Sequence, residues 1–334
     1  MRVKRVLFWV LKFWLRSFLI FLTIALGLIV TQWPADHLEG ATIDFSRQAA
    51  LASQSPAPLL EYSARDGEVL GYRHYQSSDL APPLMVFIHG SGWHGLGYDG
   101  LAQALVKSGN LEVIVPDLRG HGPNPSRRGD VDYIGQLEDD LFDLISKVRK
   151  PDQKLIIAGH SSGGGLAIRF AGGQYGNMLD GAVLLAPFLK YNAPTMRDNA
   201  GGWTRALTRR IIGLSMLNII GVTQLNGLTV LQFNFPDSML NGPLGATATT
   251  SYSYRMNTSF APRSDYLADI KALPPFLLIA GKKDESFVAE AFEPLMAEIT
   301  SKGRYNLLED VSHLGIINNP EVIAMIGKFV AKTR

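Results

Sequence analysis

One serine in this sequence lies between two glycines in a pattern typical of a catalytic nucleophile, Gly159-His160-Ser161-Ser162-Gly163. The apolar run KLIIAGH (154–160) leads into it and GGLAIRFAG (164–172) follows, so Ser161 would stand on a tight turn from a strand into a helix. Glycines suit such a turn because it leaves no room for a Cβ. The pattern indicates Ser161 as a nucleophile, although turns rich in glycine and serine also join strands to helices with no catalytic role.

The base that would activate Ser161 can be chosen by its place in the chain. A serine hydroxyl is a weak nucleophile until a neighbouring base takes its proton, and on strand–turn–helix sites of this kind the order is serine, acid, histidine. Of the seven histidines, only His313 follows Ser161. It lies in VSHLG (311–315), a polar loop between an expected strand and the last expected helix. The sequence therefore predicts His313 as the general base.

The third member of such a site is a carboxylate that orients the histidine. Asp284 follows the apolar run PFLLIAG (275–281) by three residues, whereas the stretch after the preceding strand has no acid before Asp198. Asp284 is thus the predicted acid, and its neighbour Glu285 is the alternative. An aspartate after a strand can also merely cap the next helix.

Two backbone N–H groups are needed to hold the oxyanion that forms when the serine attacks. We expect one from Ser162, directly after the nucleophile, and one from Ser91 in HGSGW (89–93), where small residues let the loop approach a substrate. His89 is expected to hold this loop together, and His160 to pack beside the site. The loop lacks the spacing and the Lys-Ser/Thr ending of a phosphate-binding loop.

Alternating strands and helices would position these residues. Short apolar runs alternate with helix-like runs over 59–187 and again over 274–334, which predicts a mostly parallel sheet with helices on both faces. Asp66-Gly67, between two strand-like runs, predicts a hairpin near the start. The alternation stops over 188–273, so we expect a cap or lid inserted between two late strands. Residues 36–58 are expected to be a linker.

The first 35 residues carry five basic residues, no acid, and an uncharged apolar stretch at 17–35. About 20 apolar residues in a helix span a bilayer, so residues 1–35 are predicted to be a short cytoplasmic stub and a transmembrane anchor. Basic residues before the span and acids after it predict that the rest of the chain lies outside the cytoplasm, in the periplasm of a Gram-negative cell. A cleaved signal peptide and a helix lying in the membrane surface are the alternatives.

Composition excludes several other classes of function. The chain has 334 residues, a net charge of +2 and no cysteine. Disulfides, thiol nucleophiles and cysteine-ligated metals are therefore excluded, and a basic face for nucleic acid is not expected. We expect no cofactor and no metal. Within 188–273 eight basic residues stand against four acids, which favours an anionic or lipid headgroup over a free amine as the bound group.

In combination these motifs resemble the α/β-hydrolase superfamily, and within it the monoglyceride-lipase/lysophospholipase and serine-aminopeptidase-like branch. The resemblance covers about 80–190 and 275–334, in the strings FIHGSGWHG, VPDLRGHGPNPSRRGDVDYIGQLEDDL, IIAGHSSGGGLAIRF, LLAP, GKKDE and VSHLG. It implies an eight-stranded, mostly parallel sheet, a Ser-His-Asp triad, no cofactor, and a cap where 188–273 lies.

The sequence therefore predicts a membrane-anchored serine hydrolase that cleaves a carboxylic ester through a triad of Ser161, His313 and Asp284 and an acyl-enzyme. Acylglycerols or lysophospholipids are the favoured substrates, because an anchor would hold the cap against lipid. The alternatives are a serine aminopeptidase or amidase on the same triad, and a non-catalytic binding protein on this fold. An intact triad weighs against the last.

Overall fold

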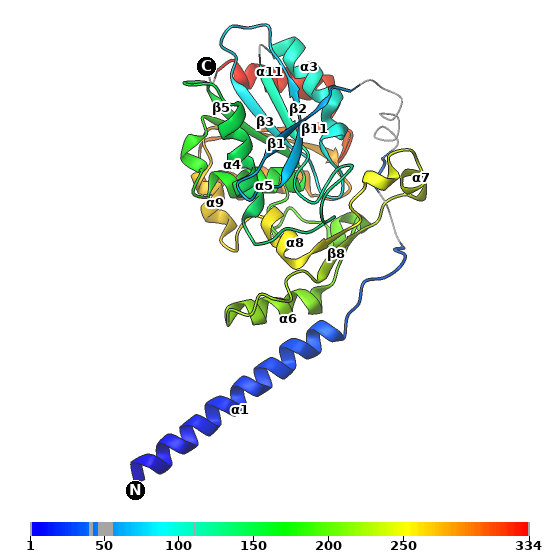
Figure 1. Ribbon diagram of the computed structural model, residues 1–334. Helices are drawn as coiled ribbons and strands as arrows, with labels where there is room; N and C mark the ends of the chain where they lie inside the picture. The colour runs from blue at the N-terminus through cyan, green and yellow to red at the C-terminus, as the bar shows by residue number, and fades with distance from the viewer. Residues whose placement is uncertain (1, 40–42, 46–55, 110, 333–334) are drawn as a thin grey trace.

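A computed structural model describes residues 2–39, 43–45, 56–109 and 111–332 (Figure 1). Eight strands form one sheet in the order β1-β2-β4-β3-β5-β6-β10-β11. β1 pairs antiparallel with β2, and β2 with β4. The other neighbours are parallel, which confirms the predicted, mostly parallel eight-stranded sheet. The strands are Leu59–Ser63 (β1), Val69–Tyr75 (β2), Leu84–Ile88 (β3), Glu112–Pro116 (β4), Leu155–His160 (β5), Gly181–Leu185 (β6), Phe276–Lys283 (β10) and Gly303–Ser312 (β11).

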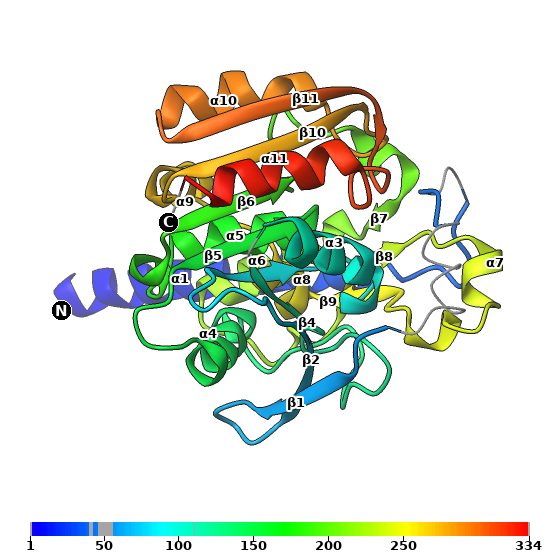
Figure 2. The ribbon, with the colours of Figure 1, turned by 90° about the horizontal axis from the view of Figure 1, so that it is seen from above.

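Helices cover both faces of this sheet, because each crossover between parallel strands must run over one face. α3 (Asp99–Gly109) and α11 (Pro320–Val330) lie side by side on one face (Figure 2). α4 (Gln136–Val148), α5 (Ser162–Ala171) and α10 (Phe292–Ile299) cover the other. The central strands are therefore buried on both sides, which explains why β3 and the first four residues of β5 are unbroken apolar runs rather than alternating ones.

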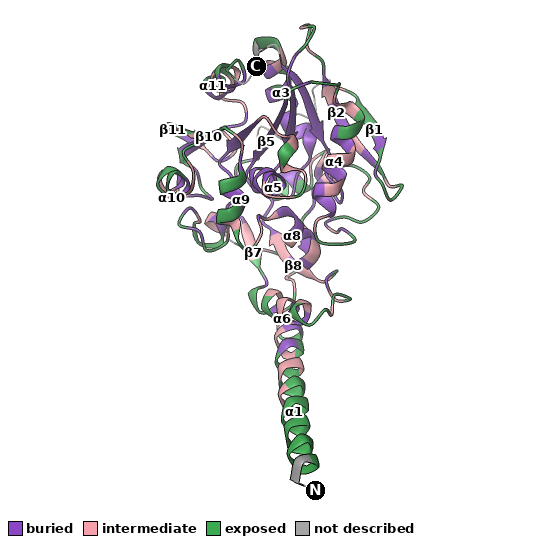
Figure 3. Ribbon diagram, turned by 90° about the vertical axis from the view of Figure 1, so that its left-hand side faces the viewer, coloured by how far each residue is buried: buried purple, intermediate pink, exposed green. Residues whose placement is uncertain are grey.

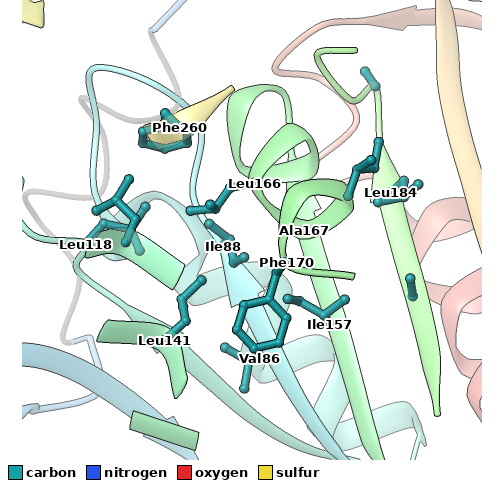
Figure 4. Close-up of a cluster of buried hydrophobic side chains, with 14 of the residues drawn as sticks. Val86, Ile88, Leu118, Leu141, Ile157, Leu166, Ala167, Phe170, Leu184 and Phe260 are labelled. Carbon is teal, nitrogen blue, oxygen red and sulfur yellow. The ribbon is translucent and has the colours of Figure 1, made fainter. Parts of the chain in front are cut away.

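The core beneath α5 fixes the place where strands end and the site begins. Side chains of the central strands meet those of α5 there (Figure 4), and full burial of one large apolar side chain stabilises the fold by about 1.5–3 kcal/mol. This packing holds the ends of β3 and β5 against the first turn of α5. The fully buried residues in this contact are Val86, Ile88, Ile157, Leu184, Leu166, Ala167 and Phe170.

The chain between β6 and β10 builds a second, smaller sheet. β7 (Thr204–Ala206), β8 (Thr229–Phe233) and β9 (Ser251–Ser253) pair antiparallel in it. The helices of this stretch are α6 (Thr208–Ile219), α7 (Asp237–Leu240), α8 (Tyr254–Phe260) and α9 (Tyr266–Ala272). α9 packs on α5, so the end of the stretch 188–273 joins the layer that covers the main sheet.

The N-terminal helix α1 spans Arg2–Val30. Its part from Lys4 to Val30 is long and apolar enough to cross a membrane, as an anchor or as a signal sequence. The helix ends before the predicted limit at residue 35, because Pro34 disfavours helical geometry at Trp33. The Trp33 indole instead donates to the carbonyl of Val30 (Nε1···O 2.9 Å) and closes the last turn.

The end of α1 packs against α6. Ala25 and Ile29 of α1 are buried there with Leu214 and Leu217 of α6, whereas the rest of α1 is largely exposed (Figure 3). Gly213 lies at the crossing, where a Cβ would overlap the carbonyl oxygen of Ala25. The apolar helix is therefore seated on the smaller unit between β6 and β10.

The stretch expected to be a linker, 36–58, is described only in part. Within it, Ile43 and Phe45 are buried against the main apolar core. At these two positions the chain packs on the folded domain, which its content of alanine, serine, glutamine and proline did not suggest.

Candidate active site

Ser161 stands on a strained turn between β5 and α5. Its backbone has φ 56° and ψ −123°, a conformation that costs a residue with a side chain about 1–3 kcal/mol. A Cβ on Gly159 would overlap the carbonyl oxygen of Gly163, and a Cβ on Gly163 would overlap that of Ile88. Both glycines of the motif are thus required by the close approach of backbone to backbone. The turn presents Ser161 at the carboxyl end of the sheet.

His313 follows β11, and its ring is held by Asp284. The Nδ1 atom lies 2.8 Å from Asp284 Oδ2, and since a carboxylate can only accept, Nδ1 carries the proton and Nε2 is left as the acceptor. The His313 side chain is 2% exposed. Glu285, the alternative acid, accepts a hydrogen bond from the main-chain N–H of His313 (2.9 Å) instead of from its ring.

Asp284 lies just after β10 in a position that keeps it ionised. Burial alone would raise the pKa of its carboxyl group, but the nearby His313 and two main-chain N–H donors outweigh burial and hold that pKa below its ordinary value. The donors are the N–H groups of Ser286 and Phe287, each 2.8 Å from Oδ1. One carboxylate oxygen of Asp284 thus accepts from the His313 ring, and the other accepts from the backbone.

Ser161 and His313 line the same small pocket, together with Ser91. Its other walls are mostly apolar, and no carboxylate is among its lining residues. Ser162, the second expected oxyanion donor, begins α5 directly after Ser161. The structure therefore brings Ser161, His313 and Ser91 to one cavity, with Asp284 behind His313. The remaining lining residues are Ile43, Phe45, Gly90, Trp93, Gly97, Tyr98, His160, Trp203, Leu314 and Ile317.

Residues 81–321 match the family described as serine aminopeptidase, S33. The chain belongs to this family of α/β hydrolases. Over 157 residues it is 28% identical to monoglyceride lipase from Rattus norvegicus, covering 46% of this chain and 48% of the lipase. The chain thus spans about half the length of the curated relatives it matches.

Solved structures share the fold over most of this α/β hydrolase. A soluble variant of monoglyceride lipase from Saccharomyces cerevisiae has a TM-score of 0.64 and 17% identity, and the match covers 84% of this chain and 97% of the lipase. A membrane phospholipase A, a bacterial virulence factor, has a TM-score of 0.57 and 17% identity, over 100% of this chain and 99% of the phospholipase. At these identities the likeness concerns the fold alone.

Two tyrosine–histidine pairs that the sequence did not reveal hold the loop around Ser91. On one side the N–H of Gly90 donates to the Tyr98 hydroxyl (2.9 Å), which must then donate its own proton to Nδ1 of His160 (3.0 Å). The other ring nitrogen of His160 donates to the main-chain carbonyl of His313 (Nε2···O 3.0 Å). One chain of hydrogen bonds thus joins the Ser91 loop to the backbone of His313.

The second pair lies on the other side of Ser91. The N–H of Gly92 donates to the Tyr252 hydroxyl (2.9 Å), which donates to Nε2 of His121 (2.6 Å). Nδ1 of His121 donates to the carbonyl of Arg119 (3.0 Å). With both neighbouring amides used, the Ser91 N–H has no hydrogen-bond partner among the residues that the structure describes.

These contacts require neutral histidines. Burial lowers the pKa of His160 and of His121 well below the ordinary value, with neighbouring histidines adding to the effect. His89 ties the same loop, since its Nδ1 donates to the Gly90 carbonyl (2.8 Å) and its Nε2 accepts from the N–H of Leu118 (3.1 Å). Burial lowers the pKa of His89 to about 4.

Proposed function

We propose that this α/β hydrolase cleaves carboxylic esters with Ser161 as nucleophile, His313 as general base and Asp284 as the group that orients His313. The observation that carries the proposal is the pocket that Ser161 shares with His313, whose Nδ1 is taken by Asp284. That contact leaves Nε2 as the ring nitrogen able to accept the serine proton.

In this mechanism Ser161 Oγ attacks the ester carbonyl carbon while its proton passes to Nε2 of His313. The C–O bond to the alcohol then breaks, and the same proton goes to the leaving oxygen. Water enters, gives a proton to Nε2, and its oxygen attacks the acyl-enzyme. Breaking the bond to Oγ returns the proton to Ser161 and releases the acid. Ionised Asp284 stabilises the imidazolium of His313 that forms in both the acylation and the deacylation step.

The main-chain N–H groups of Ser91 and Ser162 would hold the oxyanion of each tetrahedral intermediate. The N–H of Ser91 has no hydrogen-bond partner among the described residues and lies between two amides that are bound to tyrosine hydroxyls, which supports this role. Ser162 supports it by its place at the start of α5, where helix N–H groups have no partner within the helix.

A lipid-like ester, an acylglycerol or a lysophospholipid, is the substrate class that we propose. The mostly apolar lining of the pocket favours a hydrocarbon chain. The matched relatives named monoglyceride lipase, and the fold relative named membrane phospholipase A, support the same choice. We further propose that 188–273 acts as the cap over the core formed by 59–187 and 274–334.

Membrane attachment through α1 is part of the proposal. We propose that residues 1–35 form an uncleaved anchor and that the catalytic domain lies outside the cytoplasm. The close packing of α1 against α6 supports an anchor that stays with the mature protein, since a signal sequence that is cleaved off would not pack against the folded domain.

An aminopeptidase would need an acidic group to hold the free amine of its substrate. No carboxylate lines the pocket among the described residues, so this activity is less favoured than ester hydrolysis. A non-catalytic binding protein would have no use for a nucleophile on a strained turn beside an oriented histidine.

The first experiment is labelling of the full-length protein with a fluorophosphonate, followed by turnover of p-nitrophenyl esters, monoglycerides, lysophospholipids and aminoacyl amides. We expect labelling and ester turnover. Amide turnover without ester turnover would establish the aminopeptidase, and neither labelling nor turnover would establish the binding protein.

A further inference from the structure

The segment between α1 and β1 supplies two walls of the pocket that holds Ser161. Ile43 and Phe45 both line it, and both are almost fully buried. The Phe45 ring lies against three other aromatic rings, with centroid distances of 4.9 Å to Phe235, 5.2 Å to Trp203 and 6.3 Å to Trp93. Trp93 and Trp203 line the pocket as well.

The pocket is too small for a lipid chain while Phe45 is in place. Its volume is about 30 Å³, room for about two water molecules, whereas sites for drug-sized ligands measure about 300–1,000 Å³. A hydrocarbon chain beside Ser161 therefore needs more space than these walls leave. Gly90, Ser161 and His313 are held by the sheet and its hydrogen bonds, but Ile43 and Phe45 come from a segment outside the sheet.

The chain just before this segment is fastened to the unit between β6 and β10. Ala35 exchanges two hydrogen bonds with the Gln232 side chain, its N–H donating to Oε1 (2.9 Å) and its carbonyl accepting from Nε2 (2.7 Å). The Arg210 guanidinium lies over the Trp33 ring at 5.0 Å. The same unit contains Trp203 and Phe235. It therefore binds the start of the segment and also provides two of the three aromatic rings that contact Phe45.

We infer that Phe45, backed by Ile43, is a specificity-determining wall that occupies the space an apolar substrate chain must take beside Ser161. The inference rests on the proposed ester hydrolysis at this site. The aromatic ring limits the length of chain that the pocket accepts, and its displacement admits longer chains. Ile43 and Phe45, which precede the core in the chain, are thereby part of the binding site.

The test compares full-length wild-type protein with Phe45→Ala, Phe45→Leu and Phe45→Trp, all in the same detergent. One substrate series keeps p-nitrophenol and lengthens the acyl group from acetyl to dodecanoyl. A second series keeps the acetyl group and lengthens the alcohol. For Phe45→Ala we expect kcat/KM for the longest substrate relative to the shortest to rise at least about tenfold in one series, since even one methylene in an apolar pocket is worth about tenfold or more. Phe45→Trp should lower the same ratio.

Tyr191→Ala is the control, because Tyr191 is an aromatic residue of the unit between β6 and β10 that is 77% exposed and does not line the pocket. It should leave the ratio unchanged. A fluorophosphonate titration counts active Ser161 in every variant, and Phe45→Leu supplies the comparison if Phe45→Ala does not fold. Unchanged ratios in both series, with full labelling, would overturn the inference. Absence of ester turnover in the wild-type protein would instead overturn the proposed function.

Discussion

His160 donates a hydrogen bond from its ring to the main-chain carbonyl of His313, at 3.0 Å. His160, directly before the proposed nucleophile Ser161, thus holds the proposed base His313, although His160 and His313 lie 153 positions apart in the chain. Because a carbonyl can only accept, the proton of His160 must be on Nε2, and the ring must be neutral to accept from Tyr98. The geometry of the site depends on this neutral form.

Ser161→Ala should abolish both ester turnover and fluorophosphonate labelling, with a loss of about 10⁴-fold or more. The reason is that no other hydroxyl would stand on the strained turn beside His313. Ser162→Ala should keep both activities, because only its main-chain N–H is given a role and alanine retains it. Labelling that persists in Ser161→Ala, located by peptide mass mapping, would show that another residue is the nucleophile.

Asp284→Asn should lower kcat by about 10³–10⁴-fold with little change in folding. An asparagine can offer an N–H to the ring and so favour the tautomer that cannot accept the serine proton. Glu285→Gln is the matched control, since Glu285 binds only the main-chain N–H of His313. Steady-state kinetics on both variants separate the roles of the two carboxylates. An equal loss of kcat in Glu285→Gln would contradict the assignment of the orienting role to Asp284.

Tyr98→Phe should weaken the loop that carries Ser91. The substitution leaves the N–H of Gly90 and Nδ1 of His160 buried without their partner, at about 1–3 kcal/mol for each lost contact. We expect a lower melting temperature. We also expect a fall in kcat with KM little changed, because the N–H of Ser91, which the weakened loop would displace, matters most when the oxyanion forms.

Tyr305→Phe is the control for that loss. The Tyr305 hydroxyl is buried and has no hydrogen-bond partner among the described residues, so its removal should leave stability and kcat unchanged. If Tyr98→Phe behaves like Tyr305→Phe in thermal unfolding and in kinetics, the chain of bonds from Gly90 to His313 does not position the site.

The glycine spacing and chain order allowed Ser161, His313 and Asp284 to be proposed, because those patterns are local or depend only on order. The tyrosine–histidine pairs could not be foreseen in the same way. Tyr98 and Gly90 are close in the chain, but Tyr252 reaches Gly92 across 160 positions, and no local pattern marks a tyrosine whose hydroxyl binds a distant amide.

Part of the basic excess in 188–273 is engaged in ion pairs. Arg255 pairs with Asp130, and Arg263 pairs with Glu138 and Asp269. The pairs with Asp130 and Glu138 join this stretch to the core, whereas Asp269 lies within the stretch itself. A charge count along the sequence cannot show such pairing. The sheet was easier to predict, since strands buried on both faces are continuous apolar runs.

Stability should fall as the pH is lowered from about 6.5 to about 4. In the unfolded chain a histidine has its ordinary pKa of about 6.5. In the folded protein burial lowers the pKa of His89 to about 4 and the pKa values of His121 and His160 well below the ordinary value. The unfolded state therefore binds more protons in this window. The contribution of His89 is fully present above pH 6.5 and amounts to about 3 kcal/mol, lost by about pH 4.

Urea unfolding at pH 7.5, 6.5, 5.5 and 4.5 measures this effect. The free energy of unfolding should be level between pH 7.5 and 6.5 and then decrease with each step. Flat stability down to pH 4.5 would mean that these histidines are protonated in the folded state, which would contradict the directions assigned to their hydrogen bonds.

The orientation of α1 follows from its charges and its length. Lys4–Val30 has 27 residues, about 40 Å of helix at about 1.5 Å per residue, enough to cross the roughly 30 Å hydrocarbon core. Lys12 Nζ lies over the Phe8 ring at 4.3 Å, one turn toward the N-terminus. A basic side chain directed that way can reach the headgroups on the N-terminal side.

Basic residues before a span favour the cytoplasmic side for that end, so the domain after α1 should lie outside the cytoplasm. Alkaline phosphatase fused after Ala57 should be active in a Gram-negative host, and a green fluorescent protein fused at the same place should be dark, because it does not become fluorescent after export in an unfolded state. The matched control lacks residues 2–30 and should reverse both signals. Carbonate washing should leave the full-length protein in the membrane fraction, whereas a cleaved signal sequence would release it. Bright fluorescence with inactive phosphatase in the full-length fusion would place the domain in the cytoplasm.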